Sequence, residues 1–146
     1  FFDSDSLVEE KAGCSVSEIF ARWGEQKFRD VEASTIKEHL EKGALVLATG
    51  GGAIMNESTA DEIFNRSISI WVKADIETIL ARVSKNSNRP LLAVENPRKV
   101  LEELLEKRTP IYKRAMLKLD SAEDRSGAAL ENILNEIAAH AMTDQA

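Results

Sequence analysis

A run of six mostly apolar residues, Ala44 to Thr49, leads directly into three consecutive glycines, Gly50 to Gly52. An unbroken apolar run of this length, without polar alternation, is typical of a strand in a parallel sheet that is covered on both faces. Parallel strands need crossover connections, which are usually helices. This segment therefore predicts an α/β fold, in which strands and helices alternate along the chain.

The rest of the sequence shows that alternation. Two further strands are predicted at Ser67–Val72 and Met116–Asp120, and Phe1 and Phe2 are predicted to end another. Capping residues and apolar periodicity predict helices over Ser6–Gly13, Ser15–Trp23, Glu25–Lys42, Ser58–Asn65, Asp75–Lys85, Asn96–Pro110 and Gly127–Met142. The prediction is a single α/β domain over residues 1–146 with a mostly parallel sheet.

Charge and cysteine content argue against several classes of protein. The chain has 25 acidic and 19 basic residues, a net charge of -6, which argues against binding nucleic acid through overall positive charge and gives no signal for a membrane surface. Cys14 is the only cysteine, so an intrachain disulfide is excluded and a reducing compartment is expected. No apolar run approaches the roughly 18 residues of a transmembrane helix. We expect a cytoplasmic protein without a nucleic-acid or membrane partner.

The three glycines are the first candidate binding element. Placed after a buried strand, Gly50, Gly51 and Gly52 expose backbone N–H groups that a ligand can approach closely and that can cradle an anion. The alternative is a tight turn that needs a positive φ angle. One glycine serves a turn, so three in a row favour ligand binding. The segment is not a Walker A loop, because no Gly-Lys-Ser/Thr follows it.

Two aspartates stand at the start of the chain, at the predicted carboxyl edge of a strand. Ligands bind at this edge of open α/β sheets, so Asp3 and Asp5 could hold a cation or accept a hydroxyl proton. The alternative is a helix cap and a solvated acid. His39 and His140 are predicted to be surface residues, because no partner with metal-ligand spacing accompanies them.

Several arginines are candidates for binding an anion. Arg29 has Glu25 four residues before it and Glu32 three residues after it, so both could hold the guanidinium on a helix. A solvated charged face is the alternative, and spacing alone favours it. Arg89 lies in a polar loop and Arg108 on a helix, where an arginine can close over phosphates or clamp a carboxylate.

Taken in order, these segments resemble a known family. They are Asp-Ser-Asp from position 3, Gly-Glu-x-x-Phe-Arg-x-x-Glu from 24, Leu-Ala-Thr-Gly-Gly-Gly-Ala from 47, Asn-Arg-Pro-Leu-Leu from 88 and Lys-Arg-x-Pro-x-Tyr from 107. Up to about Gly127, the chain resembles shikimate kinases. The resemblance implies the three-layer, P-loop fold of nucleoside-monophosphate kinases, here lacking its first, central strand and first helix, with a lid loop over residues 85–96.

The resemblance also implies an activity, ATP-dependent phosphorylation of the 3-hydroxyl of shikimate in aromatic amino-acid (chorismate) biosynthesis. A monomer that uses ATP and Mg²⁺ is expected. Asp5 would bind the substrate hydroxyls and act as the base. The other implied roles are carboxylate binding by Arg29 and Arg108, backbone contacts to shikimate from Gly50, Gly51 and Gly52, placement of Mg²⁺ by Asp3, and nucleotide contacts from Arg82, Arg89 and Arg125.

The family pattern has one further part, a strand, a Gly-x-x-x-x-Gly-Lys-Ser/Thr loop and a helix before the Asp-x-Asp strand. This sequence contains no such loop, so we expect a truncated, inactive chain. A non-catalytic relative that binds a ligand or a partner is the alternative. A related kinase acting on gluconate is disfavoured by the Phe-Arg-x-x-Glu and triple-glycine motifs together.

The absent strand would lie between Ala44–Thr49 and Ser67–Val72. If its place is open, these two strands should lie about 10 Å apart, twice the usual strand spacing, and should not hydrogen-bond to each other. Their unpaired edges and exposed apolar faces would then make the chain unstable or prone to aggregation.

Overall fold

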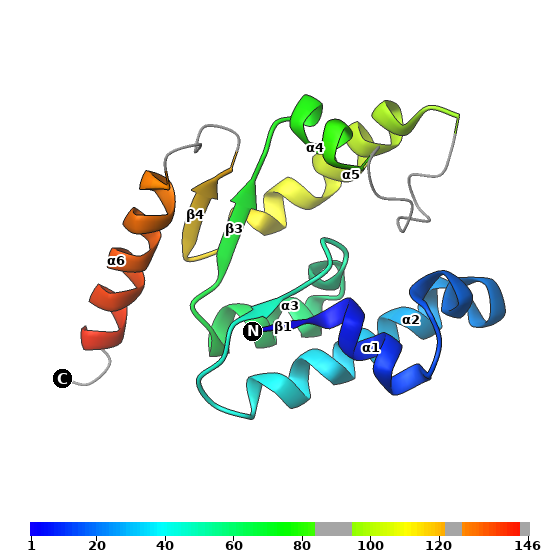
Figure 1. Cartoon of the computed structure of the whole chain (residues 1–146), viewed down its shortest axis with the longest axis horizontal. Coiled ribbons are helices and arrows are strands. Elements are labelled where there is room, and N and C mark those ends of the chain that lie inside the picture. Colours follow the sequence, from blue (N-terminus) through cyan, green and yellow to red (C-terminus); the bar gives the residue numbers. More distant parts are fainter. Residues whose placement is uncertain (84–94, 122–126, 144–146) are drawn as a thin grey trace.

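The computed structural model describes residues 1–83, 95–121 and 127–143. Helices and strands alternate along the chain as predicted, and each predicted element has a counterpart at nearly the same position (Figure 1). The elements are β1 (Phe2–Asp3), α1 (Ser4–Ala12), α2 (Val16–Leu40), β2 (Leu47–Ala48), the 3₁₀ turn η1 (Ala53–Met55), α3 (Glu57–Arg66), β3 (Ile70–Lys73), α4 (Ile76–Val83), α5 (Pro97–Tyr112), β4 (Leu117–Asp120) and α6 (Ala128–Thr143).

The strands form two separate parallel pairs. In one pair β1 lies beside β2, with Asp3 opposite Ala48, and in the other β3 lies beside β4, with Ile70 opposite Leu117. Within the described residues β2 and β3 do not pair. The expectation that the strands at 44–49 and 67–72 make no direct ladder is therefore confirmed, while their spacing of about 10 Å stays a prediction.

The strand after Ala44 is shorter and more exposed than predicted. Only Leu47 and Ala48 belong to β2, and the Val46 side chain is 65% exposed. The prediction of a strand covered on both faces was wrong in this respect. In the part of the chain that the structure describes, β2 also pairs only with β1, so its other edge has no strand against it.

Helix α1 begins earlier than predicted. Its N-cap is Asp3, whose carboxylate accepts a hydrogen bond from the Ser6 N–H at 3.1 Å. The prediction of Ser6 as the cap was wrong, because Ser6 stands three residues inside the helix and donates to the cap. Gly13 ends the helix at a φ of 70°.

Helix α2 carries the Arg29 motif and has a break. Gly24, at φ 82° and ψ 172°, interrupts the helical backbone, so the predicted division into two helices at this residue is confirmed. Ser15 and Glu18 form the predicted capping box at the start. The second part of α2 then presents Arg29 and Glu32 from successive turns of one face.

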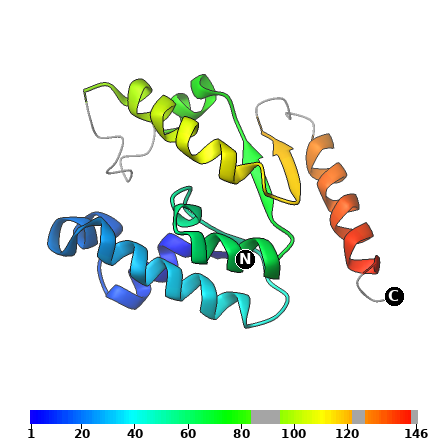
Figure 2. The same cartoon turned by 180° about the vertical axis from the view of Figure 1, so that it is seen from behind.

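Two groups of elements lie on either side of the glycine segment. Helices α1, α2 and α3 surround β1, while α4 and α5 accompany β3 and β4, and the same grouping appears from behind (Figures 1 and 2). The buried cluster of Val8, Ile19 and Phe28 joins α1 to α2. The segment after β2 enters η1, and η1 contacts α5. The glycines therefore lie where the first group meets the second.

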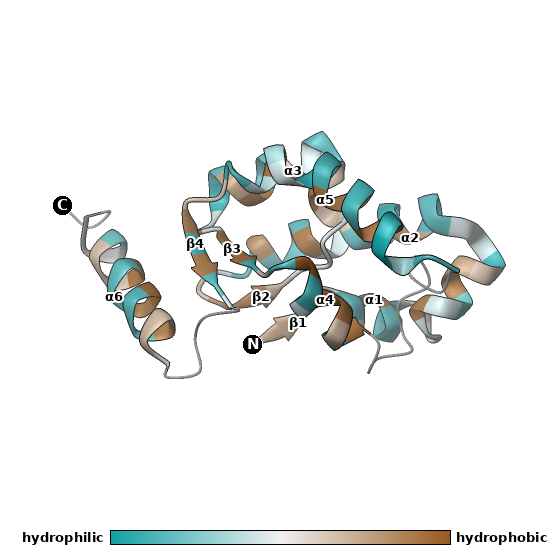
Figure 3. Cartoon of the chain, turned by 90° about the horizontal axis from the view of Figure 1, so that it is seen from above, coloured by the Kyte–Doolittle hydropathy of each residue, from teal (hydrophilic) through white to brown (hydrophobic). Residues whose placement is uncertain are grey.

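The C-terminal helix packs on the second strand pair. Helix α6 contacts β4 and buries Ile133, while Leu130 and Leu134 stay exposed. Apolar and polar residues alternate around this helix (Figure 3). Among the described residues, no helix is both long enough and apolar enough to cross a bilayer.

Helix α5 extends past its internal proline. Pro110 was predicted to kink or end this helix, and the helix ends two residues later, at Tyr112. Arg108 and Tyr112 are four residues apart and so share one face of α5. This face meets the glycine segment.

Candidate functional site

The glycine segment is held through its carbonyl groups. The Gly50 carbonyl accepts from Ala53 N–H at 3.1 Å, and the Gly51 carbonyl accepts from the Tyr112 hydroxyl at 2.9 Å. None of Gly50, Gly51 and Gly52 has a positive φ. A turn that requires left-handed backbone is therefore not the reason for three glycines here.

Close approach by polar side chains explains the glycines instead. A Cβ atom at Gly50 would lie 3.1 Å from Glu32 Oε1 and 3.4 Å from Asp5 Oδ1. At Gly51 it would lie 2.6 Å from the Tyr112 oxygen and 3.1 Å from Arg108 Nη1, and at Gly52 it would lie 2.6 Å from Arg29 Cζ. Real Cβ atoms do not approach other atoms as closely as 2.6 Å, so side chains at the last two positions would displace the polar groups.

The predicted substrate-binding residues are thus brought together. Asp5 comes from α1, Arg29 from α2 and Arg108 from α5, and each approaches the glycine segment within 3.4 Å of an added Cβ. The outermost two, Asp5 and Arg108, are 103 residues apart along the sequence. Four of the five short motifs therefore correspond to one place in the fold, and the fifth, from position 88, lies outside the described residues.

Arg29 is fixed by carboxylates on its own helix. Its Nη1 lies 2.7 Å from Glu32 Oε2, and its Nη2 lies 3.3 Å from Glu25 Oε1. The Glu32 side chain is only 1% exposed, so the alternative of a solvated charged face is wrong for this pair. Burial raises the pKa of Glu32, and the adjacent Arg29 opposes that rise.

Arg108 has the opposite character. Within the described residues its buried Nε has no hydrogen-bond partner, and no carboxylate there forms an ion pair with Arg108. Arg108 is partly buried, and the five N–H groups of its guanidinium can only donate. This arrangement suits an anionic ligand that completes the pairing.

The chemistry of the cluster follows from its residue types. Two guanidinium groups can bind a carboxylate in a forked geometry, and the Asp5 carboxylate can accept a hydrogen bond from a hydroxyl. The N–H groups of Gly51 and Gly52 have no hydrogen-bond partner among the described residues. Together these groups match a small acid that also carries hydroxyl groups.

Of the four residues predicted to place Mg²⁺ or contact the nucleotide, the structure describes two. Asp3 caps α1 and is exposed, and Arg82 donates to the side chain and carbonyl of Ser121, at 3.1 and 3.2 Å. Arg89, Arg125 and the lid loop up to residue 94 lie outside the described residues. Within the described ranges, no group of three or more His, Cys, Asp or Glu residues could hold a metal ion. The Mg²⁺ role of Asp3 stays a prediction.

Two residues of the site received no role from the sequence. Ser4, fully buried between the two aspartates, accepts a hydrogen bond from Gly50 N–H at 3.3 Å. Tyr112 closes the Lys-Arg-x-Pro-x-Tyr motif, and its position four residues after Arg108 is the signal that could have identified it.

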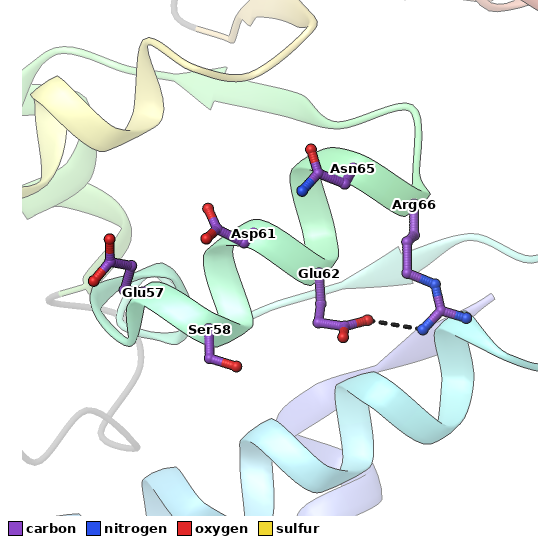
Figure 4. A pocket seen from close by; sticks show the side chains of 6 residues that line it. All are labelled: Glu57, Ser58, Asp61, Glu62, Asn65 and Arg66. Atoms are coloured by element: carbon purple, nitrogen blue, oxygen red, sulfur yellow. Dashed lines mark hydrogen bonds and ion pairs between the residues drawn. The ribbon is translucent and has the colours of Figure 1, made fainter.

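An open hollow on α3 is a separate feature of the surface. It is lined by Glu57, Ser58, Asp61, Glu62, Asn65 and Arg66 (Figure 4). Three of its four charged residues are paired, Glu62 with Arg66 at 2.7 Å and Asp61 with Arg114 at 2.7 Å. No predicted site residue lines it, so it contributes nothing to the candidate site.

Comparison with known proteins agrees with the motif order. The sequence matches the family described as shikimate kinase over residues 1–138. It is 38% identical to a shikimate kinase of Bartonella henselae over 94% of this chain and 65% of that protein, and 39% identical to one of Mesorhizobium japonicum over 99% and 71%. The chain thus spans about two thirds of the length of these curated relatives.

The structure is also similar to a solved one. The shikimate kinase from Acinetobacter baumannii in complex with shikimate is 35% identical and superposes with a TM-score of 0.89, covering 96% of this chain and 79% of that one. This likeness confirms the predicted fold class. The sequence match, the two enzymes and the shared fold all lead to one conclusion: the chain belongs to the shikimate kinase family.

Proposed function

We propose that this chain carries the shikimate-binding part of an ATP-dependent shikimate 3-kinase. The observation that carries the proposal is the convergence of Asp5, Arg29 and Arg108 on the glycine segment 50–52. The shikimate complex of the Acinetobacter relative supports the choice of substrate. Shikimate is an anionic acid with hydroxyl groups, which is the chemistry these residues match.

Each group has a defined task in this proposal. Arg29 and Arg108 bind the carboxylate, which supplies the anion that Arg108 lacks. Asp5 accepts a hydrogen bond from the reacting hydroxyl. It would take the hydroxyl proton as that oxygen bonds to the γ-phosphorus of ATP and the bond from this phosphorus to ADP breaks. In phosphoryl transfer most of the catalysis is positioning and charge stabilisation, so the carboxylate needs only to accept the proton late.

The described residues do not by themselves form a site for ATP or Mg²⁺. ATP would supply the phosphoryl group, and Mg²⁺ would neutralise charge on the phosphates. The sequence contains no Gly-x-x-x-x-Gly-Lys-Ser/Thr segment, and among described residues only Asp3 and Arg82 fall on the predicted nucleotide side. We therefore propose that these 146 residues bind shikimate without transferring phosphate. The lid role of residues 85–96 and the nucleotide contacts of Arg89 and Arg125 remain part of the proposal.

The cellular setting is proposed on the same basis. A cytoplasmic location is supported by the single cysteine, which is typical of a reducing compartment, and a monomer is part of the proposal. The excess of acidic residues supports the absence of nucleic-acid partners.

The test is ADP release in the presence of shikimate, ATP and Mg²⁺. We expect none from the 146-residue chain and measurable turnover when a strand, a Gly-x-x-x-x-Gly-Lys-Ser/Thr loop and a helix precede it. A non-catalytic relative would bind shikimate in both forms and turn over in neither. That last result would overturn the kinase proposal.

A further inference from the structure

We propose that Tyr112 is a positioning residue, whose hydroxyl fixes the peptide between Gly51 and Gly52 so that its N–H group is presented to the ligand. The proposal rests on the proposed function and extends it to a residue with no role in the account above. It begins from the 2.9 Å hydrogen bond that the Tyr112 hydroxyl donates to the Gly51 carbonyl.

The hydrogen bond from Tyr112 to the Gly51 carbonyl also fixes the direction of the Gly52 N–H group. In a trans peptide the C=O and the following N–H point in opposite directions within one plane. The structure has no cis peptide bonds in its described residues. Because the Gly51 carbonyl faces Tyr112, the Gly52 N–H faces the other side of the peptide, where no described residue accepts it.

The preceding peptide has the same arrangement with a different partner. The Gly50 carbonyl accepts from Ala53 N–H at 3.1 Å, so the Gly51 N–H faces away from η1. It also lacks an acceptor among the described residues. Two successive carbonyls are held, one by the backbone and one by Tyr112, and two successive N–H groups remain for a ligand oxygen.

The peptide between Gly51 and Gly52 is the one that a side chain, Tyr112, holds in place. Glycines have no Cβ to restrict them, so a Gly-Gly peptide reorients at little steric cost. In the described part of the chain, the Tyr112 hydroxyl is the one hydrogen-bond partner of the Gly51 carbonyl. A donor that is held in place before the ligand arrives loses less entropy on binding, which increases affinity.

Tyr112 is itself well placed to act as a support. Its ring stacks on Trp71 of β3, with centroids 5.7 Å apart and planes at 25°. Helix α5 brings the Tyr112 oxygen and Arg108 Nη1 to the same point, 2.6 and 3.1 Å from the Cβ position of Gly51. One face of α5 therefore positions both the Arg108 guanidinium and the Gly52 N–H group.

The experiment uses Tyr112→Phe, which keeps the stacked ring and removes only the hydroxyl. Thr109→Val is the matched control, because it removes a hydroxyl from the same helix three residues away. Calorimetric titration with shikimate should give a dissociation constant about three- to tenfold weaker for Tyr112→Phe, as for the loss of one hydrogen bond, and an unchanged one for Thr109→Val.

A spectroscopic signature separates positioning from general stability. The protein has seven glycines, so selective ¹⁵N-glycine labelling gives a simple amide spectrum. In the unmodified protein the Gly52 amide should give one sharp signal that shifts when shikimate is added. In Tyr112→Phe that signal should broaden or split before ligand is added, while the Gly13 and Gly24 signals remain as they were.

The outcomes distinguish the two proposals. If the unmodified chain binds shikimate and Tyr112→Phe binds it equally well with an unchanged Gly52 signal, the role of Tyr112 is refuted and the proposed function stands. If the unmodified chain does not bind shikimate, the proposed function fails. Should Tyr112→Phe not fold, hydrogen exchange of the Gly52 amide in the unmodified chain decides, since exchange that shikimate does not slow would overturn the proposal.

Discussion

The Arg29 guanidinium and the Glu32 carboxylate form a 2.7 Å ion pair in which Glu32 is almost fully buried. Oε2 of Glu32 makes this pair, while Oε1 is buried and has no hydrogen-bond partner in the described residues. Such a carboxylate is costly to keep charged, and Arg29 offsets part of that cost. The pair therefore orients Arg29 at the expense of stability.

The first prediction concerns the pH dependence of stability. The pKa of Glu32 is raised from the ordinary value of 4.5, so the native protein holds this proton to higher pH than the unfolded chain does. The stability that the protonated Glu32 side chain contributes is fully present below about pH 4.5. It is lost as the pH rises through the raised pKa of Glu32 in the native protein. Glu32→Gln cannot titrate. The free energy of unfolding of the unmodified protein, minus that of the variant, should therefore fall with rising pH.

Urea unfolding at a series of pH values, followed by circular dichroism, measures this difference. Glu25→Gln is the control, since it removes a carboxylate beside the same arginine from a half-exposed position. Identical pH profiles for the unmodified protein and Glu32→Gln would contradict the prediction.

The second prediction concerns the arginine without an anionic partner. Arg108→Lys keeps the positive charge and loses the planar fork that matches a carboxylate. Hydrogen bonds to charged groups contribute about 1.5–3 kcal/mol, so shikimate affinity should fall roughly 10- to 100-fold. Calorimetric titration measures it, with Arg22→Lys on the exposed face of α2 as the control. Equal affinity in both variants would show that Arg108 does not bind the ligand.

The third prediction concerns the close approach at the glycines. Gly52→Ala would place a methyl group 2.6 Å from Arg29 Cζ, so the guanidinium must move and shikimate binding should weaken at least tenfold. Gly13→Ala is the control, because its φ of 70° makes alanine strained while open space surrounds it. That variant should cost about 1 kcal/mol of stability without affecting affinity. A Gly52→Ala protein that binds normally would exclude the proposed packing.

The fourth prediction concerns the strand edges that lack a neighbour. Val46, just before β2, and Val72, in β3, are 65% and 59% exposed. Each strand pairs along only one edge within the described residues, and exposed apolar residues beside an unpaired edge promote aggregation. Replacing both by threonine should raise the temperature at which the chain scatters light and leave its secondary structure unchanged. An unaltered aggregation temperature would argue against these edges as its origin, and a sharp two-state transition in calorimetry would contradict the expected instability of the unmodified chain.

The sequence predicted the elements well because local signals mark them. Gly24 and Gly13 end helical segments, and Asn96 with Pro97 begins one, through backbone preferences that hardly depend on the rest of the fold. The extent of β2 was not predictable in the same way. Whether an apolar run becomes a buried strand depends on which strands pair with it, and this information is not in the run itself.

The candidate site was predicted in part for a similar reason. Asp5, Arg29 and Arg108 stand in recognisable motifs, and the resemblance to shikimate kinases that these motifs carry implied that all three bind one substrate. The roles of Ser4 and Tyr112 depend on single hydrogen bonds to the backbone of the glycine segment, across 46 and 61 residues of sequence. Spacing along the chain cannot reveal contacts of that kind.

The most direct test is a crystal structure of this chain grown with shikimate. The account predicts electron density beside the glycine segment, with the carboxylate between Arg29 and Arg108 and a hydroxyl at Asp5. Shikimate bound elsewhere, or bound with its hydroxyl groups on the arginines and its carboxylate toward Asp5, would contradict it.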